Sequence, residues 1–280
     1  MKIQYLGTAA GEGVPGLFCN CDKCKMARKL GGKNLRARTQ AVIDDDLLVD
    51  YSPDTYMNAV RFGVDLSKIK HLLITHTHLD HFAPAELELR GKGYADKMAE
   101  PILTVYGTNA VGEKLKTGAE NLQTIEFVEL KLFEPTKVGD YTVTALPAIH
   151  MLGRGEQAVT FIIEKNGKTI FYCNDTGLDK SVNQLPTSII EYFKANNIKI
   201  DFIGFDCTYG VNYDPWGQHL AFSEIDIIIK KFKEEGFITD QSILYATHFS
   251  HWHVLEHEQL VEYAKQYGLQ VAYDGIIIEV

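Results

Sequence analysis

Short apolar runs recur along the chain, and their length and β-branched content predict buried β-strands. The runs cover Ile3–Leu6, Ala41–Val49, His71–Thr75, Ile102–Tyr106, Tyr141–Leu146, Val159–Ile163, Thr169–Cys173, Phe202–Phe205, Ile243–Ala246 and Val271–Val280. Between two of these runs lies the pair Asn166-Gly167, which tolerates positive φ angles and therefore predicts a tight hairpin turn.

Two other segments, Ser223–Glu235 and Glu256–Tyr267, repeat apolar residues every three to four positions, which is typical of amphipathic helices. In the first of them, Ile225, Ile228 and Phe232 fall on one stripe. Strands outnumber helices, and the helices lie between strands. We therefore expect an α/β fold in which one sheet stacks on another with helices outside, forming a single domain over residues 1–280.

The composition is that of an ordinary globular protein, with 280 residues, 45% of them apolar and 23% charged. A formal net charge of −9 argues against general nucleic-acid binding, because the chain as a whole repels phosphate backbones. The N-terminal residues lack the apolar stretch of a signal peptide, and no run approaches the roughly 18 apolar residues of a membrane span. We expect a cytoplasmic protein with a small-molecule substrate, no membrane attachment and, as the commonest assembly, a homodimer.

The most informative motif is Thr75-His76-Thr77-His78-Leu79-Asp80-His81-Phe82, which directly follows a predicted strand. In an extended backbone His76 and His78 share a face, so both can bind one cation. Asp80 and His81 follow where the chain turns, and they can bind a second cation a few ångströms away. Three imidazoles and a carboxylate suit zinc, manganese or iron, whereas calcium prefers oxygen ligands alone.

A second cluster of potential ligands is the array Cys19-Asn20-Cys21-Asp22-Lys23-Cys24. Three thiolates at this spacing can bind one tetrahedral zinc ion if another segment supplies the fourth ligand, for which the chain offers His251, His253 and His257. An iron–sulfur site and three unconnected free cysteines are the alternatives. The helical pattern that begins near His253 is expected to leave His257 on a solvated face.

The His-x-His-x-Asp-His motif after a strand resembles that of the metallo-β-lactamase superfamily. The resemblance implies an αββα four-layer sandwich with further metal ligands at later strand ends, and His150, Asp175 and His248 occur there in order. It implies a dinuclear site of two divalent ions, zinc or manganese. By resemblance, one ion is held by His76, His78 and His150, the other by Asp80, His81 and His248, and Asp175 bridges them. Asp50, after another strand, resembles a family aspartate that supports the metal loop.

The segment from Gly7 to Pro15, leading into Cys19, Cys21 and Cys24, resembles two branches of this superfamily. One comprises the PhnP-type cyclic-phosphate phosphodiesterases, and the other the PqqB-type proteins of pyrroloquinoline quinone biosynthesis. In the phosphodiesterase branch a histidine three residues after the last catalytic histidine completes a structural zinc site. That spacing points to His251 here, after His248. The PqqB branch usually lacks the intact histidine motif, which favours a hydrolase.

The chemistry that this resemblance implies is hydrolysis by a metal-bound hydroxide, with Asp80 helping to orient the hydroxide. The main prediction is a phosphodiesterase acting on a small, cyclic or open, phosphodiester, with His219 as the general acid that protonates the leaving group. A lactone or thioester hydrolase and a PqqB-like cofactor-biosynthesis protein are the alternatives. Further candidates for substrate contact are Arg36, Arg38, Arg154, Tyr209, Tyr213 and Trp216. For each arginine, solvent exposure or ion pairing is the favoured alternative. For the aromatic residues, packing on the surface of a loop is the alternative.

Overall fold

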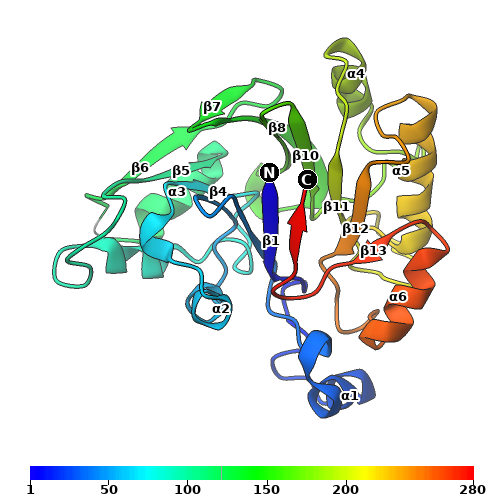
Figure 1. The fold of residues 1–280 in the computed structure, drawn as a ribbon, viewed down its shortest axis with the longest axis horizontal. Helices are drawn as coiled ribbons and strands as arrows, with labels where there is room; N and C mark the ends of the chain where they lie inside the picture. The colour runs from blue at the N-terminus through cyan, green and yellow to red at the C-terminus, as the bar shows by residue number, and fades with distance from the viewer. Residues whose placement is uncertain (121) are drawn as a thin grey trace.

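The computed structural model describes residues 1–120 and 122–280 and, at position 154, the backbone alone. Two seven-stranded sheets stand face to face (Figure 1). The first sheet has the order β14 (Ile277–Glu279), β1 (Lys2–Gly7), β2 (Gln40–Ile43), β3 (Leu47–Val49), β4 (His71–Leu73), β5 (Leu103–Gly107) and β6 (Ile125–Glu129). The second has the order β13 (Gln270–Val271), β12 (Ile243–Thr247), β11 (Phe202–Asp206), β10 (Lys168–Cys173), β9 (Gln157–Lys165), β8 (Tyr141–Met151) and β7 (Thr136–Val138).

Alternating side chains on the strands build three apolar layers. Along β10, Ile170 and Tyr172 join the core between the two sheets, whereas Phe171 joins the core on the outer face. Both faces of this strand are apolar because both are covered, and successive side chains point to opposite faces of a sheet. The sheets are thus held together by burial of apolar area on both sides.

Helices cover the outer faces of the two sheets. The second sheet is covered by α4 (Thr187–Ala195), α5 (Phe222–Glu234) and α6 (His257–Lys265), whose apolar residues share its outer core (Figure 1). Residues of α3 (Asn109–Gly118) and of the 3₁₀ segment η3 (Pro84–Arg90) pack in the corresponding core of the first sheet, and α2 (Thr55–Phe62) adds Phe62 to it. The helix α1 (Asp22–Leu30) follows the cysteine loop. This arrangement confirms the predicted αββα fold.

The predicted extent of two strands is wrong, because each run contains two strands. The run Ala41–Val49 is a hairpin of β2 and β3, because Asp44 and Asp45 adopt φ angles of 47° and 65° that turn the chain. The run Val271–Val280 splits into β13 and β14, which lie in different sheets. A continuous apolar pattern conceals such breaks, since both halves are buried.

The parallel strands bring the polar strand ends to one edge of the sandwich. Strands β3, β4, β5 and β6 pair in parallel in the first sheet, as do β10, β11, β12 and β13 in the second. Neighbouring parallel strands end at the same sheet edge. The loops that carry Asp50, His76, Asp175 and His248 therefore start from corresponding ends of these strands.

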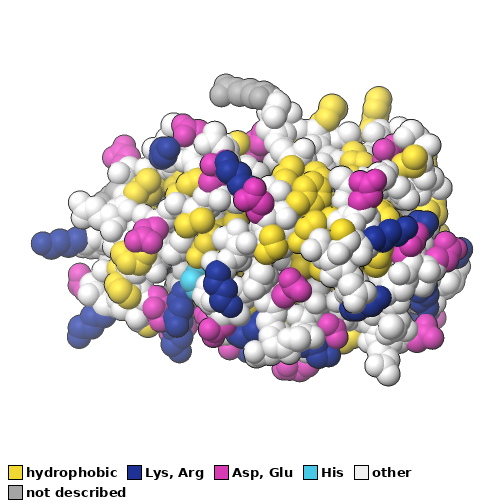
Figure 2. Space-filling view, turned by 90° about the horizontal axis from the view of Figure 1, so that it is seen from above, with side chains coloured by type: hydrophobic (Ala, Val, Ile, Leu, Met, Phe, Trp, Pro, Cys, Tyr) yellow, Lys and Arg dark blue, Asp and Glu magenta, His cyan; other side chains and the backbone are white. Residues whose placement is uncertain are grey.

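The surface seen from above the view of Figure 1 carries acidic and basic side chains intermingled around apolar ones (Figure 2). This face therefore shows no continuous basic field of the kind that nucleic-acid binding uses. Within the described residues, no helix has the length and hydropathy needed to cross a bilayer.

A close approach between the sheets gives the first prediction. A Cβ atom at Gly204 would lie 2.0 Å from the hydroxyl oxygen of Tyr5, and the next atom of that ring is 3.4 Å away. The Tyr5 hydroxyl is buried without a hydrogen-bond partner among the described residues. Gly204→Ala should therefore lower the free energy of unfolding by about 1–3 kcal/mol, and adding Tyr5→Phe should restore most of the loss.

Urea denaturation of the two single variants and the double variant measures this coupling. Gly153→Ala is the control, because nothing lies within 4 Å of a Cβ built there. Losses that simply add in the double variant would contradict the proposed clash.

Candidate metal centre

Three imidazoles meet where β4 and β8 end. His76 and His78 follow β4 with Thr77 between them, and His150 lies near the end of β8. Nε2 of His76 and Nε2 of His150 each lie 3.1 Å from Nδ1 of His78. One ring nitrogen from each of the three residues lies within 4.8 Å of the others, which is the spacing of ligands around one cation.

A second group lies beside the first. It comprises Asp80, His81 and His248, with Oδ2 of Asp80 3.2 Å from Nε2 of His81. The carboxylate of Asp175 joins the two groups, because its Oδ2 lies 2.5 Å from Nε2 of His81 and 3.1 Å from Nε2 of His248, while it also clusters with His76. The structure thus brings together all seven residues that the resemblance implies, in the two sets that it implies.

The atoms at the centre of this cluster have the character of metal ligands. Nε2 of His81, Nε2 of His248 and Oδ2 of Asp175 are buried, and none makes a hydrogen bond of acceptable geometry within the described part of the chain. Buried polar atoms without partners are costly, and these three point at one another. A nitrogen and oxygen donor set of this kind fits two zinc or manganese ions.

Hydrogen bonds on the far side of two rings orient them for ligation. Nδ1 of His81 donates to Oδ2 of Asp50 at 2.8 Å, and Asp50 is itself held by the backbone and hydroxyl of Thr75. Nδ1 of His248 lies 2.8 Å from the hydroxyl of Thr208. Each bond leaves Nε2 of the ring directed at the centre, where it can bind a cation once it has lost its proton. The expected supporting role of Asp50 agrees with this geometry.

Burial and neighbouring charges together set the protonation of the imidazoles and carboxylates. Burial alone would lower the pKa of His81 and of His248, but Asp175 beside them raises both, so a bound cation would have to displace a proton from these rings. Burial lowers the pKa of His150 to about 4 and that of His76 well below the usual value, so both rings are neutral near pH 7, as metal ligands must be. Burial alone would raise the pKa of Asp175, but the neighbouring His248 and His81 outweigh it and lower that pKa. The bridging carboxylate is therefore ionised.

Two residues without any sequence signal fix the loop between His76 and His78. Glu156 accepts a hydrogen bond from the backbone N–H of Thr77 at 3.0 Å and another from its hydroxyl. On the other side, Nζ of Lys114 donates to the carbonyl of Thr77 at 2.5 Å. These residues lie far from the motif in sequence, so only the fold reveals that they hold it.

His219 lies at the rim of the same centre. Its Nδ1 is 2.8 Å from Oδ2 of Asp206 and 3.3 Å from Oδ1 of Asp175. Burial alone would lower the pKa of His219, but Asp206, followed by Asp175, raises it to about 9. The ring therefore carries a proton at neutral pH. It does not cap α5, whose N-cap is Ala221.

A cavity of about 460 Å³ opens over this centre. Its described lining includes Tyr209 but neither Tyr213 nor Trp216, and both of the latter are exposed. Trp252, which the sequence did not single out, lines it instead. Of the three aromatic candidates, Tyr209 lines the cavity, whereas the exposure of Tyr213 and Trp216 agrees with the alternative of a loop surface.

The two arginines whose side chains are described bind protein groups, and for Arg38 this is the ion pairing that the sequence analysis favoured over a phosphate contact. Arg36 is buried and donates to the hydroxyl of Thr8 and the carbonyl of Ala272, and Arg38 pairs with Asp54 at 2.7 Å. Neither lines the cavity over the metal centre. The side chain of Arg154 lies outside the described residues.

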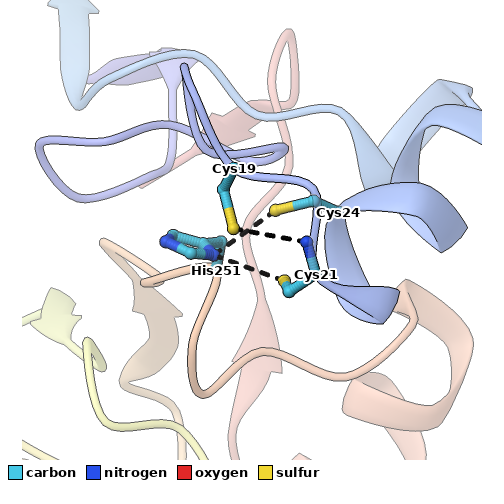
Figure 3. A group of neighbouring side chains, drawn as sticks. All are labelled: Cys19, Cys21, Cys24 and His251. Atoms are coloured by element: carbon cyan, nitrogen blue, oxygen red, sulfur yellow. Dashed lines mark hydrogen bonds between the residues drawn. The ribbon is translucent and has the colours of Figure 1, made fainter.

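The three cysteines converge with His251, as Figure 3 shows. Nδ1 of His251 lies 3.3 Å from Sγ of Cys24 and 3.8 Å from Sγ of Cys21. The backbone N–H of Cys24 contributes most to lowering the pKa of Cys21 to about 6, whereas burial raises the pKa of Cys24 to about 11. The buried thiol of Cys24 would lose its proton readily only beside a bound cation. The set fits a structural zinc ion.

The other two histidines near this cluster take different places. His253 stacks on Tyr209 with the ring centroids 4.5 Å apart. The expectation for His257 is wrong, because α6 begins at this residue and the ring is buried, with Nδ1 3.2 Å from Nη2 of Arg36. An amphipathic pattern does not show that a loop will cover the first turn of a helix.

Loss of one thiolate tests the structural site. Cys21→Ser should remove about one zinc ion per chain and lower the thermal unfolding temperature, because binding energy at such a site is also folding energy. The same change should weaken metal binding at the histidine and aspartate centre, since His251 and His248 share one short loop. Metal analysis and calorimetry measure both effects. Asp22→Asn, at an exposed neighbour, is the control, and unchanged zinc content in Cys21→Ser would refute the site.

Curated relatives share the sequence at moderate identity. The chain is 28% identical over 195 residues to coenzyme PQQ synthesis protein B of Methylorubrum populi, an alignment that covers 61% of this chain and 64% of that relative. It is 26% identical to the same-named protein of Acinetobacter baylyi, over the full length of both chains. These names support the PqqB-like alternative more directly than the phosphodiesterase prediction.

Solved structures share the fold. A diphosphatase from the PhnP family superimposes with a TM-score of 0.74 at 21% identity, covering 100% of this chain and 97% of that one. Zinc-bound PqqB from Methylobacterium extorquens also gives a TM-score of 0.74, at 19% identity and with both chains fully covered. The family model described as the beta-lactamase superfamily domain matches residues 46–195, more than half of the chain. The chain therefore belongs to the metallo-β-lactamase superfamily.

Proposed function

We propose that this chain is a dinuclear metallohydrolase whose substrate is a small phosphodiester. The observation that carries the proposal is the convergence of seven nitrogen and oxygen ligands in two sets joined by Asp175, with the protonated ring of His219 beside them. When bound, two such ions polarise the phosphoryl oxygens and lower the pKa of an attacking water.

The charges around the cavity favour a diester over a monoester. Glu12, Asp80 and Asp175 line the cavity, and its described side chains include no lysine or arginine. Two divalent ions would offset these three carboxylates and leave one positive charge. The protonated His219 adds no more, because its charge is cancelled by the Asp206 carboxylate paired with it. A phosphodiester carries a single charge at neutral pH and suits this balance better.

His219 is the general acid in this proposal. Hydrolysis of an alkyl ester needs a proton on the leaving oxygen, and His219 carries one at neutral pH because of Asp206. Asp206 also accepts hydrogen bonds from the backbone and hydroxyl of Thr208 at 2.8 Å, so its position is fixed. The pair therefore holds a proton at a defined place on the cavity rim.

A second candidate is a step in cofactor biosynthesis of the PqqB type, favoured by the names of the curated relatives. The same ligand set suits a lactone or thioester, since a polarised carbonyl is attacked by water just as a phosphoryl group is. The experiments below separate the substrate classes while holding the metal centre constant.

Hydrolysis of bis(p-nitrophenyl) phosphate by the manganese- or zinc-loaded chain is the direct test. We expect turnover at least tenfold faster than with p-nitrophenyl phosphate, and a loss of about a hundredfold or more in Asp80→Asn. Asp240→Asn, at an exposed aspartate paired with Lys233, is the matched control and should retain full activity. Hydrolysis of lactones or thioesters, but not of diesters, by the metal-loaded protein would contradict the phosphodiesterase proposal. About one metal per chain, all of it lost in Cys21→Ser, would favour the PqqB-type role.

A comparison of leaving groups that do and do not need a proton tests the role of His219 as the general acid. p-Nitrophenolate departs without a proton, so His219→Ala should lower the rate on bis(p-nitrophenyl) phosphate only a few-fold. With dimethyl phosphate, whose methoxide leaving group needs a proton, the loss should be greater by about tenfold or more, as measured by kcat/KM on both substrates. His253→Ala alters the same cavity and should affect both substrates equally. Equal losses in His219→Ala would show that this residue is not the acid.

A further inference from the structure

A second cavity lies on the outer face of the first sheet, away from the metal centre. Its volume is about 500 Å³, which falls in the range of roughly 300–1,000 Å³ typical of small-molecule sites. Strands β3, β4 and β5 form its floor, and α2 and the segment from η3 to Met98 form its walls. It shares no described lining residue with the cavity over the metal centre.

The interior of this cavity is apolar. Four leucines of the core beside the first sheet also line the cavity: Leu48, Leu72, Leu87 and Leu103. Ile69 and Met98 extend this apolar lining. The described lining residues that carry polar side-chain atoms are Tyr51, Tyr56, Ser67, Glu86 and Arg90. An apolar hollow of this size gains free energy when an apolar group displaces its water.

Arg90 lines this cavity and carries a hydrogen-bond donor that has no acceptor among the described residues. Its Nη2 donates to the carbonyl of Glu100 at 2.8 Å, whereas its Nε is buried and has no hydrogen-bond partner among the described residues. Within the same part of the chain, no ion pair joins Arg90 to Glu86, although both line the cavity and Glu86 is exposed. A buried donor without an acceptor destabilises the folded chain, so a ligand that supplies the acceptor is favoured.

Tyr51 offers a second donor in the same lining. Its hydroxyl makes no hydrogen bond with the described residues, and burial raises its pKa to about 12, so it keeps its proton at neutral pH. A guanidinium and a phenol together suit a carboxylate, which accepts hydrogen bonds at both oxygens.

We propose that this cavity binds a small apolar carboxylic acid, with the carboxylate at Arg90 and Tyr51 and the hydrocarbon body on the leucine-lined floor. The proposal does not depend on the function proposed for the metal centre.

Calorimetric titration of the full, metal-loaded chain with octanoate tests this proposal. We expect saturable binding of one octanoate per chain, about tenfold tighter than 1-octanol or octylamine, because those molecules lack the charged acceptor. Binding should persist in Asp80→Asn, which separates this cavity from carboxylate ligation at the metal centre. Octanol binding as tightly as octanoate would overturn the assignment of the carboxylate to Arg90.

Variants in the cavity locate the ligand. Arg90→Gln should weaken octanoate binding about tenfold, whereas Glu86→Gln should leave it unchanged or tighten it by removing a like charge. Ala95 also lines the cavity, so Ala95→Phe should fill it and abolish binding while Arg90 remains in place. The thermal unfolding temperature of each variant checks that the chain is folded. Full octanoate binding in both Arg90→Gln and Ala95→Phe would overturn the proposal.

Discussion

The buried carboxylate of Asp50 ties together the segments on which the metal centre depends. Asp50 follows β3, accepts hydrogen bonds from the backbone and hydroxyl of Thr75 after β4, and accepts another from Nδ1 of His81. Its own backbone N–H donates to the carbonyl of Leu73 in β4. One fully buried side chain thus fixes the ends of two parallel strands and the tautomer of a ligand between them.

Three residues of this centre adopt a strained backbone conformation. Asp50, Asp175 and His248 adopt φ angles of 64°, 46° and 60°, a left-handed region that non-glycine residues seldom occupy. Each lies directly after a strand or within two residues of its end, where the chain must turn sharply to direct a side chain across the sheet edge. Such conformations cost about 1–3 kcal/mol each and persist only where other contacts enforce them. The apolar layers on both faces of the sheets supply those contacts.

The sequence predicted those features of the molecule that depend on residues close together in the chain. Strand periodicity predicted the layers, and the spacing of His76, His78, Asp80 and His81 indicated a dinuclear site because all four lie within six residues of one loop. His150, Asp175 and His248 needed the family resemblance, since a lone residue at a strand end has no local signature. Other contacts arise only when distant segments meet. These are the hydrogen bonds of Glu156 and Lys114 to Thr77 and the contact of Asp206 with His219.

The errors have a common physical origin. Arg36 and His257 were expected to contact solvent or substrate because charged and amphipathic residues usually do, yet the fold buries them against each other. Burial of a cation demands partners, and Arg36 finds them in the hydroxyl of Thr8 and the carbonyl of Ala272, two segments that meet near the start and the end of the chain. A polar residue at a long-range junction cannot be distinguished from a substrate contact by its sequence neighbours. What separates the two is whether protein atoms satisfy its donors, as they do for Arg36, or leave ligand atoms unpartnered, as at His81, Asp175 and His248.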